Sequence, residues 1–141
     1  MSSAIGYSGT PLAKKLGLKS GSRVCAIEAP SSYQELLAPL PENITFENRP
    51  SALTNVVHIF ATRKIELAKR LSSLRQKLNS EAAIWVSWPK QTSKVPTTIT
   101  EDVIRELAFP LGLVDVKVCA VTEVWSGLKL VVRKELREHA P

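Results

Sequence analysis

The stretch that decides the fold is residues 22–40, SRVCAIEAPSSYQELLAPL. Residues 24–28 have the pattern of a buried strand, and the S-x-x-E capping box that begins at Ser32 predicts a helix that continues to Leu40. A strand, a tight turn and a helix in this order are typical of the start of a nucleotide-binding α/β domain. The turn itself (29–33, APSSY) lacks the glycines that allow a cofactor's phosphates to approach the backbone. The stretch therefore predicts a Rossmann-like fold without the usual cofactor turn.

The rest of the chain continues this alternation of strands and helices. The further expected strands are 44–47, 56–61, 82–88, 114–124 and 128–133, and the further expected helices are 63–79, capped by Thr62, and 100–111, capped by Thr100. The connection 125–127 (WSG) is so short that it requires an antiparallel hairpin. The order β-α-β-β-α-β-α-β-β predicts a three-layer α/β fold, with a mostly parallel sheet of about six strands that ends in this hairpin.

The length of 141 residues allows one domain. We expect an N-terminal lead-in over residues 1–21, in which 12–16 form a short helical turn, then the Rossmann-like domain over 22–134 and a C-terminal tail over 135–141. The lead-in lacks the charged-then-apolar order of a signal peptide, and no apolar run approaches the roughly 18 residues of a membrane span. These features predict a cytoplasmic protein.

The chain is basic, with 19 lysine and arginine residues against 13 aspartate and glutamate residues, a net charge of +6. This balance favours anionic partners, and we expect an anionic small molecule or an acidic protein surface. The predicted helix 63–79 has most of its outer face basic, which leaves weak nucleic-acid binding as an alternative. No aromatic residue of this helix could stack on bases, so nucleic acid is the less favoured partner.

Four strings carry a resemblance to a known family: GYSGTPLAKKLGLK (6–19), WVSWPK (85–90), GLVDVKVCAV (112–121) and WSGLKLVVRK (125–134). They resemble the bacterial domain-of-unknown-function 3052 family over nearly the whole chain. At the level of layout, residues 18–133 are also similar to the class I methyltransferase plan, shortened by one βα unit. The first resemblance implies a family with no assigned activity, and the second implies the fold.

In an open α/β sheet, ligands gather outside the carboxyl ends of the parallel strands. The candidate ligand-binding residues at those ends are Ser31, Ser32, Glu47, Thr62, Arg63, Ser87, Trp88, Lys90, Lys94 and Trp125. We expect the group around Trp88 to face a shallow cleft that Ser31 and Thr62 share. For several of these residues a structural role is an open alternative: Ser32 as a helix cap, Glu47 as a surface carboxylate, and Trp88 as a core residue.

Nothing in the sequence suggests a catalytic residue. His58 lies within an apolar strand pattern and is expected to be a core histidine, and His139 lies in the tail. Cys25 and Cys119 are isolated apolar-strand thiols without metal-type spacing. We therefore expect no cofactor and no metal, and the favoured function is a non-enzymatic binding or regulatory module. A nucleotide-binding or transferase-like enzyme with a degenerate cofactor turn is the alternative.

Overall fold

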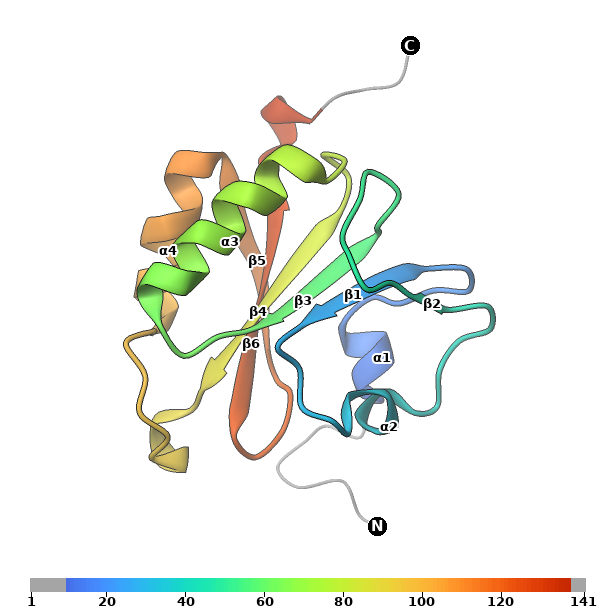
Figure 1. Ribbon diagram of the computed structural model, residues 1–141, viewed down its shortest axis with the longest axis horizontal. Coiled ribbons are helices and arrows are strands. Elements are labelled where there is room, and N and C mark those ends of the chain that lie inside the picture. The colour runs from blue at the N-terminus through green and yellow to red at the C-terminus, as the bar shows by residue number, and fades with distance from the viewer. Residues whose placement is uncertain (1–9, 138–141) are drawn as a thin grey trace.

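The computed structural model describes residues 10–137, which form a six-stranded sheet flanked by helices (Figure 1). The strands are β1 (Arg23–Ile27), β2 (Thr45–Phe46), β3 (Val56–Phe60), β4 (Ala83–Pro89), β5 (Leu113–Ala120) and β6 (Trp125–Val132). Their order across the sheet is β2-β1-β3-β4-β6-β5. The pairs from β2 to β4 are parallel, whereas β6 is antiparallel to both of its neighbours. The predicted fold, a mostly parallel sheet that ends in an antiparallel hairpin, is confirmed.

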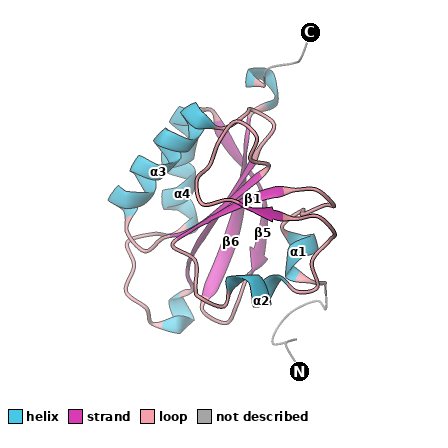
Figure 2. Cartoon of the chain, turned by 45° about the vertical axis from the view of Figure 1, so that its right-hand side comes forward, coloured by secondary structure: helices cyan, strands magenta, loops and turns pink. Residues whose placement is uncertain are grey.

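The helices cover the two faces of this sheet unequally (Figure 2). The long helices α3 (Lys64–Lys77) and α4 (Glu101–Ala108) lie on one face, and the short helices α1 (Leu12–Lys15) and α2 (Tyr33–Leu37) lie on the other. Short 3-10 turns follow at Gln91–Ser93, Phe109–Leu111 and Lys134–Leu136. The GYSG part of the family-like string 6–19 and the first residues of the predicted lead-in lie outside the described residues.

Strand alternation produces two cores, one on each face of the sheet. On the α3/α4 side, Val57 and Val86 pack against the leucine stripe of α3, which is Leu67, Leu71 and Leu74. On the α1/α2 side, Trp85 and Phe60 pack against Leu16 and Leu37. Because β3 is buried on both sides, its apolar run is almost continuous, as is usual for a central parallel strand.

Two of the predicted helix caps are wrong. Ser32 stands at the N-cap of α2, but its side chain accepts no capping hydrogen bond, and α2 ends at Leu37 rather than Leu40. The residue that precedes Pro39 is extended, because a following proline disfavours the helical conformation. Thr62 does not cap α3 either; the hydroxyl of Thr98 accepts the Lys64 N–H at 2.8 Å. The predicted cap at Thr100 is confirmed, since its Oγ1 accepts the N–H of Val103 at 3.1 Å.

The predicted position of the hairpin turn is also wrong. The turn lies at residues 121–124, and Trp125 is already the first residue of β6, opposite Pro89. The Thr122 side chain fixes this turn, because its Oγ1 accepts the N–H groups of Val124 and Trp125 at 3.0 and 3.1 Å. A side-chain hydrogen bond of this kind competes with strand pairing and favours a turn.

Candidate functional site

A hollow of about 450 Å³ lies where β1 and β2 end and α2 begins. It is lined by Ala26, Ala29, Ser31, Tyr33, Gln34, Glu35, Phe46, Glu47 and Asn48. These residues come from the carboxyl ends of two parallel strands and from the helix between them, which is where open α/β sheets bind their ligands. The structure therefore brings two predicted site residues, Ser31 and Glu47, into one place.

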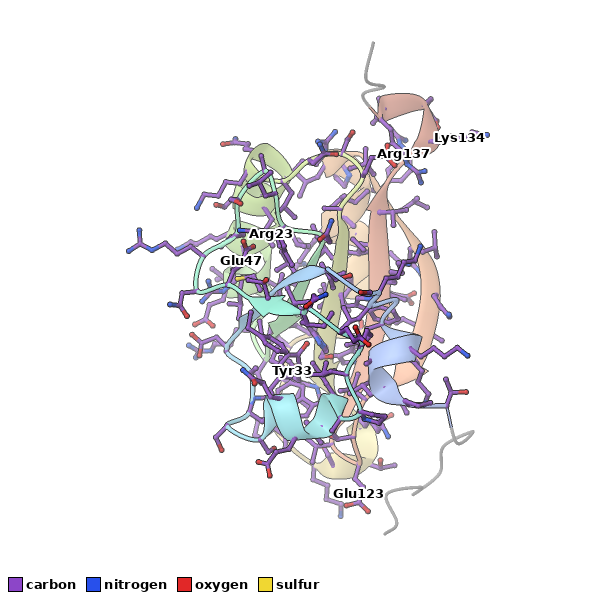
Figure 3. All side chains as sticks on the ribbon, turned by 90° about the vertical axis from the view of Figure 1, so that its right-hand side faces the viewer. Arg23, Tyr33, Glu47, Glu123, Lys134 and Arg137 are labelled. Atoms are coloured by element: carbon purple, nitrogen blue, oxygen red, sulfur yellow. The ribbon has the colours of Figure 1, made fainter. Side chains whose placement is uncertain are left out.

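Glu47 follows directly after β2, and its carboxylate is already bonded on both oxygens. Its Oε2 accepts the Arg23 Nε–H at 2.8 Å and pairs with Arg23 Nη2 at 2.6 Å, while its Oε1 accepts the Thr54 hydroxyl at 2.6 Å. The hydrogen bond from Thr54, followed by those from Arg23, lowers the pKa of Glu47. Figure 3 shows Arg23 and Glu47 together at the sheet edge, above Tyr33 in α2. Glu47 is thus ionised and fixed in position, with 11% of its side chain exposed.

Tyr33 forms the inner wall of the hollow and begins a buried chain of hydrogen bonds. Its hydroxyl lies 2.8 Å from Nδ1 of His58, and Nε2 of His58 lies 2.7 Å from Oγ of Ser87. All three side chains are buried. Burial lowers the pKa of His58 to about 3 and raises the pKa of Tyr33, so both side chains are neutral. Ser87, a predicted site residue, is therefore part of the core and does not reach the hollow.

An aromatic cluster continues this wall toward the hairpin. The rings of His58 and Phe60 stack with their centroids 4.3 Å apart, and Tyr33 and Trp125 each meet Phe60 edge-on. Trp125, a predicted site residue, packs with its ring centroid 5.2 Å from that of Phe60. It serves here as a partly buried core residue on the α1/α2 side.

The remaining predicted residues lie elsewhere. Trp88 is 9% exposed and belongs to the core on the α3/α4 side, so it packs on the other side of the sheet from the hollow. The backbone N–H of Lys90 donates to the Val124 carbonyl at 2.7 Å, which ties the loop after β4 to the hairpin turn. Lys94 is an exposed residue with a positive φ of 62° at the end of a 3-10 turn.

Thr62 and Arg63 link β3 to α3. The Thr62 carbonyl accepts the Thr98 N–H at 2.9 Å and the Thr97 hydroxyl at 2.8 Å, and Arg63 stands exposed at the N-cap of α3. The Thr62 backbone is thus used to hold the 90–98 loop. The predicted cleft shared by Trp88, Ser31 and Thr62 is therefore wrong, because Trp88 packs in the α3/α4 core while Ser31 lines the hollow on the other side of the sheet.

A second hollow, of about 390 Å³, lies between α3 and the end of β1. Its lining is Ile27, Pro50, Glu66, Lys69, Arg70, Ser73, Leu74 and Lys77. Arg70, one of the lining residues, pairs with Glu28 at 3.5 Å, and both side chains are well exposed. An exposed pair of this kind contributes little to stability. With Lys69, Arg70 and Lys77 against Glu66, the lining of this hollow is mainly basic.

The other reactive groups of the described chain are inert or structural. Burial raises the pKa of the Cys25 and Cys119 thiols, which therefore have little thiolate character. Among residues 10–137, no three histidine, cysteine, aspartate or glutamate side chains come together in a way that could hold a metal ion. Within the same residues, no helix has the length and apolar character needed to cross a bilayer.

Sequence reasoning missed the role of Tyr33. Its bond to His58 joins residues 25 positions apart in the sequence, and periodicity carries no information on such a contact. A tyrosine at the start of a helix, followed by a histidine in a buried strand, was the available signal, since a core histidine needs polar partners.

Comparisons with known proteins give a family and a fold. A sequence model described as a protein of unknown function, DUF3052, matches residues 34–134. No curated protein matches the sequence. The structure is similar to an S-adenosylmethionine-dependent methyltransferase from Aquifex aeolicus, with a TM-score of 0.67 and 14% identity over 86% of this chain and 87% of that one.

Two further solved structures agree. A putative type 11 methyltransferase from Sulfolobus solfataricus has a TM-score of 0.64 and 11% identity, over 91% of this chain and 93% of its own. The Bacillus subtilis tRNA methyltransferase TrmK has a TM-score of 0.59 and 11% identity, over 86% of this chain and 63% of its own. At such low identity, the likeness establishes the methyltransferase-like Rossmann fold.

Proposed function

Because the chain belongs to DUF3052, a family of unknown function, and has the fold of class I methyltransferases, we propose that it is a small-molecule binding module without methyl-transfer activity. The hollow beside α2 is its ligand site. The observation that carries this proposal is Tyr33, whose buried ring forms the inner wall of the hollow and is tied to the centre of the sheet by its bond to His58.

The turn after β1 supports the proposal that the protein does not bind S-adenosylmethionine or a dinucleotide. Glu28 has a positive φ of 59°, a conformation that favours glycine, yet the residues that follow it are Ala29 and Pro30. Both carry side chains where a dinucleotide or S-adenosylmethionine site brings the ligand against bare backbone, and Pro30 has no N–H to donate. The backbone of the turn follows the path of a cofactor loop, but the side chains of Ala29 and Pro30 keep a cofactor from coming close to that backbone.

The acid after β2 points the same way. In nucleotide-binding α/β domains, an acid at this place holds the ribose hydroxyls. Glu47 occupies the place, but Arg23 and Thr54 use three of its hydrogen-bonding positions. A carboxylate has about four such positions, so Glu47 retains one for a ligand. Glu47 can accept a hydrogen bond from one ligand hydroxyl, but it cannot accept from both ribose hydroxyls as a cofactor site requires.

The lining of the hollow indicates the class of ligand. Among the described residues, it contains two carboxylates, Glu35 and Glu47, and no lysine or arginine. Ser31, Gln34 and Asn48 add hydroxyl and amide groups, while Phe46 adds an apolar surface. This combination suits an uncharged molecule with hydroxyl groups and a flat ring, such as a nucleoside, and does not favour an anion.

The test is an NMR titration of the labelled protein with adenosine, an uncharged nucleoside. We expect the amide signals of Ser31, Gln34 and Asn48 to shift in a saturable manner, and Ser31→Trp to abolish the shifts by filling the hollow. Ser20→Trp, at an exposed turn outside the hollow, is the matched control and should leave them unchanged. Shifts in Ser31→Trp equal to those of the natural sequence would contradict the placement of the site.

A transferase-like enzyme is the second candidate. The positive φ of Glu28 and the place of Glu47 are the observations that favour it, because both keep the course of a cofactor site. This candidate requires S-adenosylmethionine to bind the hollow. A titration that shows S-adenosylmethionine, but not adenosine, shifting the same amides would select it over the binding module.

A further inference from the structure

The sheet carries a like-charge contact between its last two strands. Lys117 of β5 and Lys129 of β6 stand directly opposite each other in the antiparallel ladder, so their side chains leave the same face. Directly opposed residues have β-carbons about 5 Å apart, and like charges at this separation destabilise a sheet. The contact therefore has a cost for folding that an ordinary surface does not carry.

An irregularity in β5 creates this contact. Leu113 and Asp115 face the α4 side, where Leu113 is buried in the core and Asp115 accepts from Arg105 at 3.0 Å. Regular alternation would place Lys117 on that side as well. The register shifts between Asp115 and Lys117, and the extra residue, Val116, turns Lys117 to the opposite face, beside Lys129. Bulges re-aim side chains in this way and are over-represented beside functional sites.

Further lysines gather at this point. Lys129 is opposite Trp85, whose indole N–H donates to the Leu16 carbonyl at 3.1 Å, so the pair lies on the α1 side of the sheet. The ammonium group of Lys129 lies beside Gly17, where a β-carbon would be 3.9 Å from Nζ. Burial, and then repulsion from Lys117 and Lys19, lower the pKa of Lys129. Lys19 follows Gly17 by two residues, and its charge and that of the directly opposed Lys117 act on the Lys129 ammonium group.

We propose that Lys19, Lys117 and Lys129, the lysine patch, bind a small molecule that carries at least two phosphate charges. An ammonium group binds phosphate as a point charge, and bound phosphate would replace the repulsion among the lysines with attraction. The net charge of +6 favours an anionic ligand. The lysine patch is a place where such an anion can bind, whereas the acidic hollow beside α2 is not.

The shape of the patch favours a small anion over a nucleic acid. It consists of two directly opposed lysines and the nearby Lys19. A protein that follows a nucleic-acid backbone instead presents cations along a groove, usually with aromatic side chains for base stacking. On the same face, the residues next to the patch along β5 and β6 are Cys119, Gly127 and Val131, none of which can stack on a base.

The test begins with thermal unfolding in a low-salt buffer without phosphate. Lys117→Gln should unfold at a higher temperature than the natural sequence, because it removes the opposed charge from an exposed position. Lys69→Gln, which removes one charge from the exposed face of α3, is the matched control and should leave the temperature unchanged. A lower unfolding temperature for Lys117→Gln would show that the opposed lysines are not in conflict, and would contradict the proposal.

The second measurement is a calorimetric titration with inorganic pyrophosphate. We expect binding to the natural sequence and to Lys69→Gln with equal affinity, and a loss of at least about tenfold in Lys117→Gln and in Lys129→Gln. Equal losses in all three variants, or no binding to the natural sequence, would overturn the proposal. So would an oligonucleotide that binds the patch when pyrophosphate does not. Ser31→Trp should bind pyrophosphate normally, which separates this site from the hollow beside α2.

Discussion

Tyr33, His58 and Ser87 join α2, β3 and β4 through two hydrogen bonds within the core. Each nitrogen of the His58 ring meets a hydroxyl group, and because a hydroxyl can donate or accept, either neutral tautomer is satisfied. The charged form would require the ring to donate on both sides within a buried environment. Burial therefore lowers the pKa of His58 to about 3, against 6.5 for the free side chain.

This shift predicts that the protein loses stability in mild acid. Between pH 6.5 and pH 3, the unfolded chain binds a proton at His58 that the folded chain does not, so the free energy of unfolding falls as the pH falls. The His58 contribution should be about 2 kcal/mol between pH 7 and pH 5. Urea unfolding at both values measures it.

His58→Gln is the comparison variant, since glutamine does not titrate. Its free energy of unfolding at pH 7 is lower, because the bonds to Tyr33 and Ser87 change, but the difference between pH 7 and pH 5 should shrink. A difference as large as in the natural sequence would mean that other groups cause the acid sensitivity.

At the scale of elements, β4 supplies tryptophans to both faces of the sheet. Trp85 lies on the α1/α2 side, whereas Trp88 lies on the α3/α4 side beside Ile99 and Ile104. We predict that Trp88→Ala lowers the free energy of unfolding by about 3–5 kcal/mol, the usual result of removing a core tryptophan. Urea unfolding measures this loss, and a loss below about 1 kcal/mol would mean that Trp88 instead lines an open cleft.

Helix α3 contains two arginines that have different roles, although the sequence alone does not distinguish them. Arg70 forms only an exposed pair with Glu28, while Arg75 donates from Nε to the Leu111 carbonyl at 2.9 Å and so ties α3 to the turn after α4. We predict that Arg70→Glu changes the free energy of unfolding by less than about 0.5 kcal/mol, and that Arg75→Glu lowers it by about 1–2 kcal/mol. Chemical unfolding of the two variants side by side checks the difference, and equal values would contradict it.

The elements themselves were predictable from the sequence, whereas their ends and contacts were not. The apolar run of β3 and the leucine stripe of α3 each have a period that identifies the element. The cap of α3 by Thr98 and the turn held by Thr122 each depend on one side chain. From the sequence alone, neighbouring side chains are equally plausible partners for the same bonds. The bulge at Val116 leaves no trace in a period-2 pattern, so the opposition of Lys117 and Lys129 became visible only in the register.

The candidate site divides in the same way. Topology alone placed Ser31 and Glu47 at the carboxyl edge, and they do line one hollow. Trp88 lies next to the end of β4 at the same edge, but its side chain packs on the other face of the sheet, toward α3 and α4. Which face a residue at a strand end uses depends on the exact register, and a shift of one residue reverses it.

At the scale of the whole molecule, the protein keeps the methyltransferase-like Rossmann fold, while the turn after β1 and the wall formed by Tyr33 depart from a cofactor site. A fold of this kind supports many functions, so the site decides which one applies. The central claim is that this site does not hold S-adenosylmethionine, because Ala29 and Pro30 carry side chains where the cofactor would approach the backbone.

Isothermal titration calorimetry of the natural sequence with S-adenosylmethionine tests this claim most directly. We predict no heat of binding at micromolar concentrations of ligand and protein. A saturable complex with a dissociation constant in the micromolar range or below, which corresponds to about −8 kcal/mol or stronger, would contradict the account and assign the hollow to a methyltransferase cofactor.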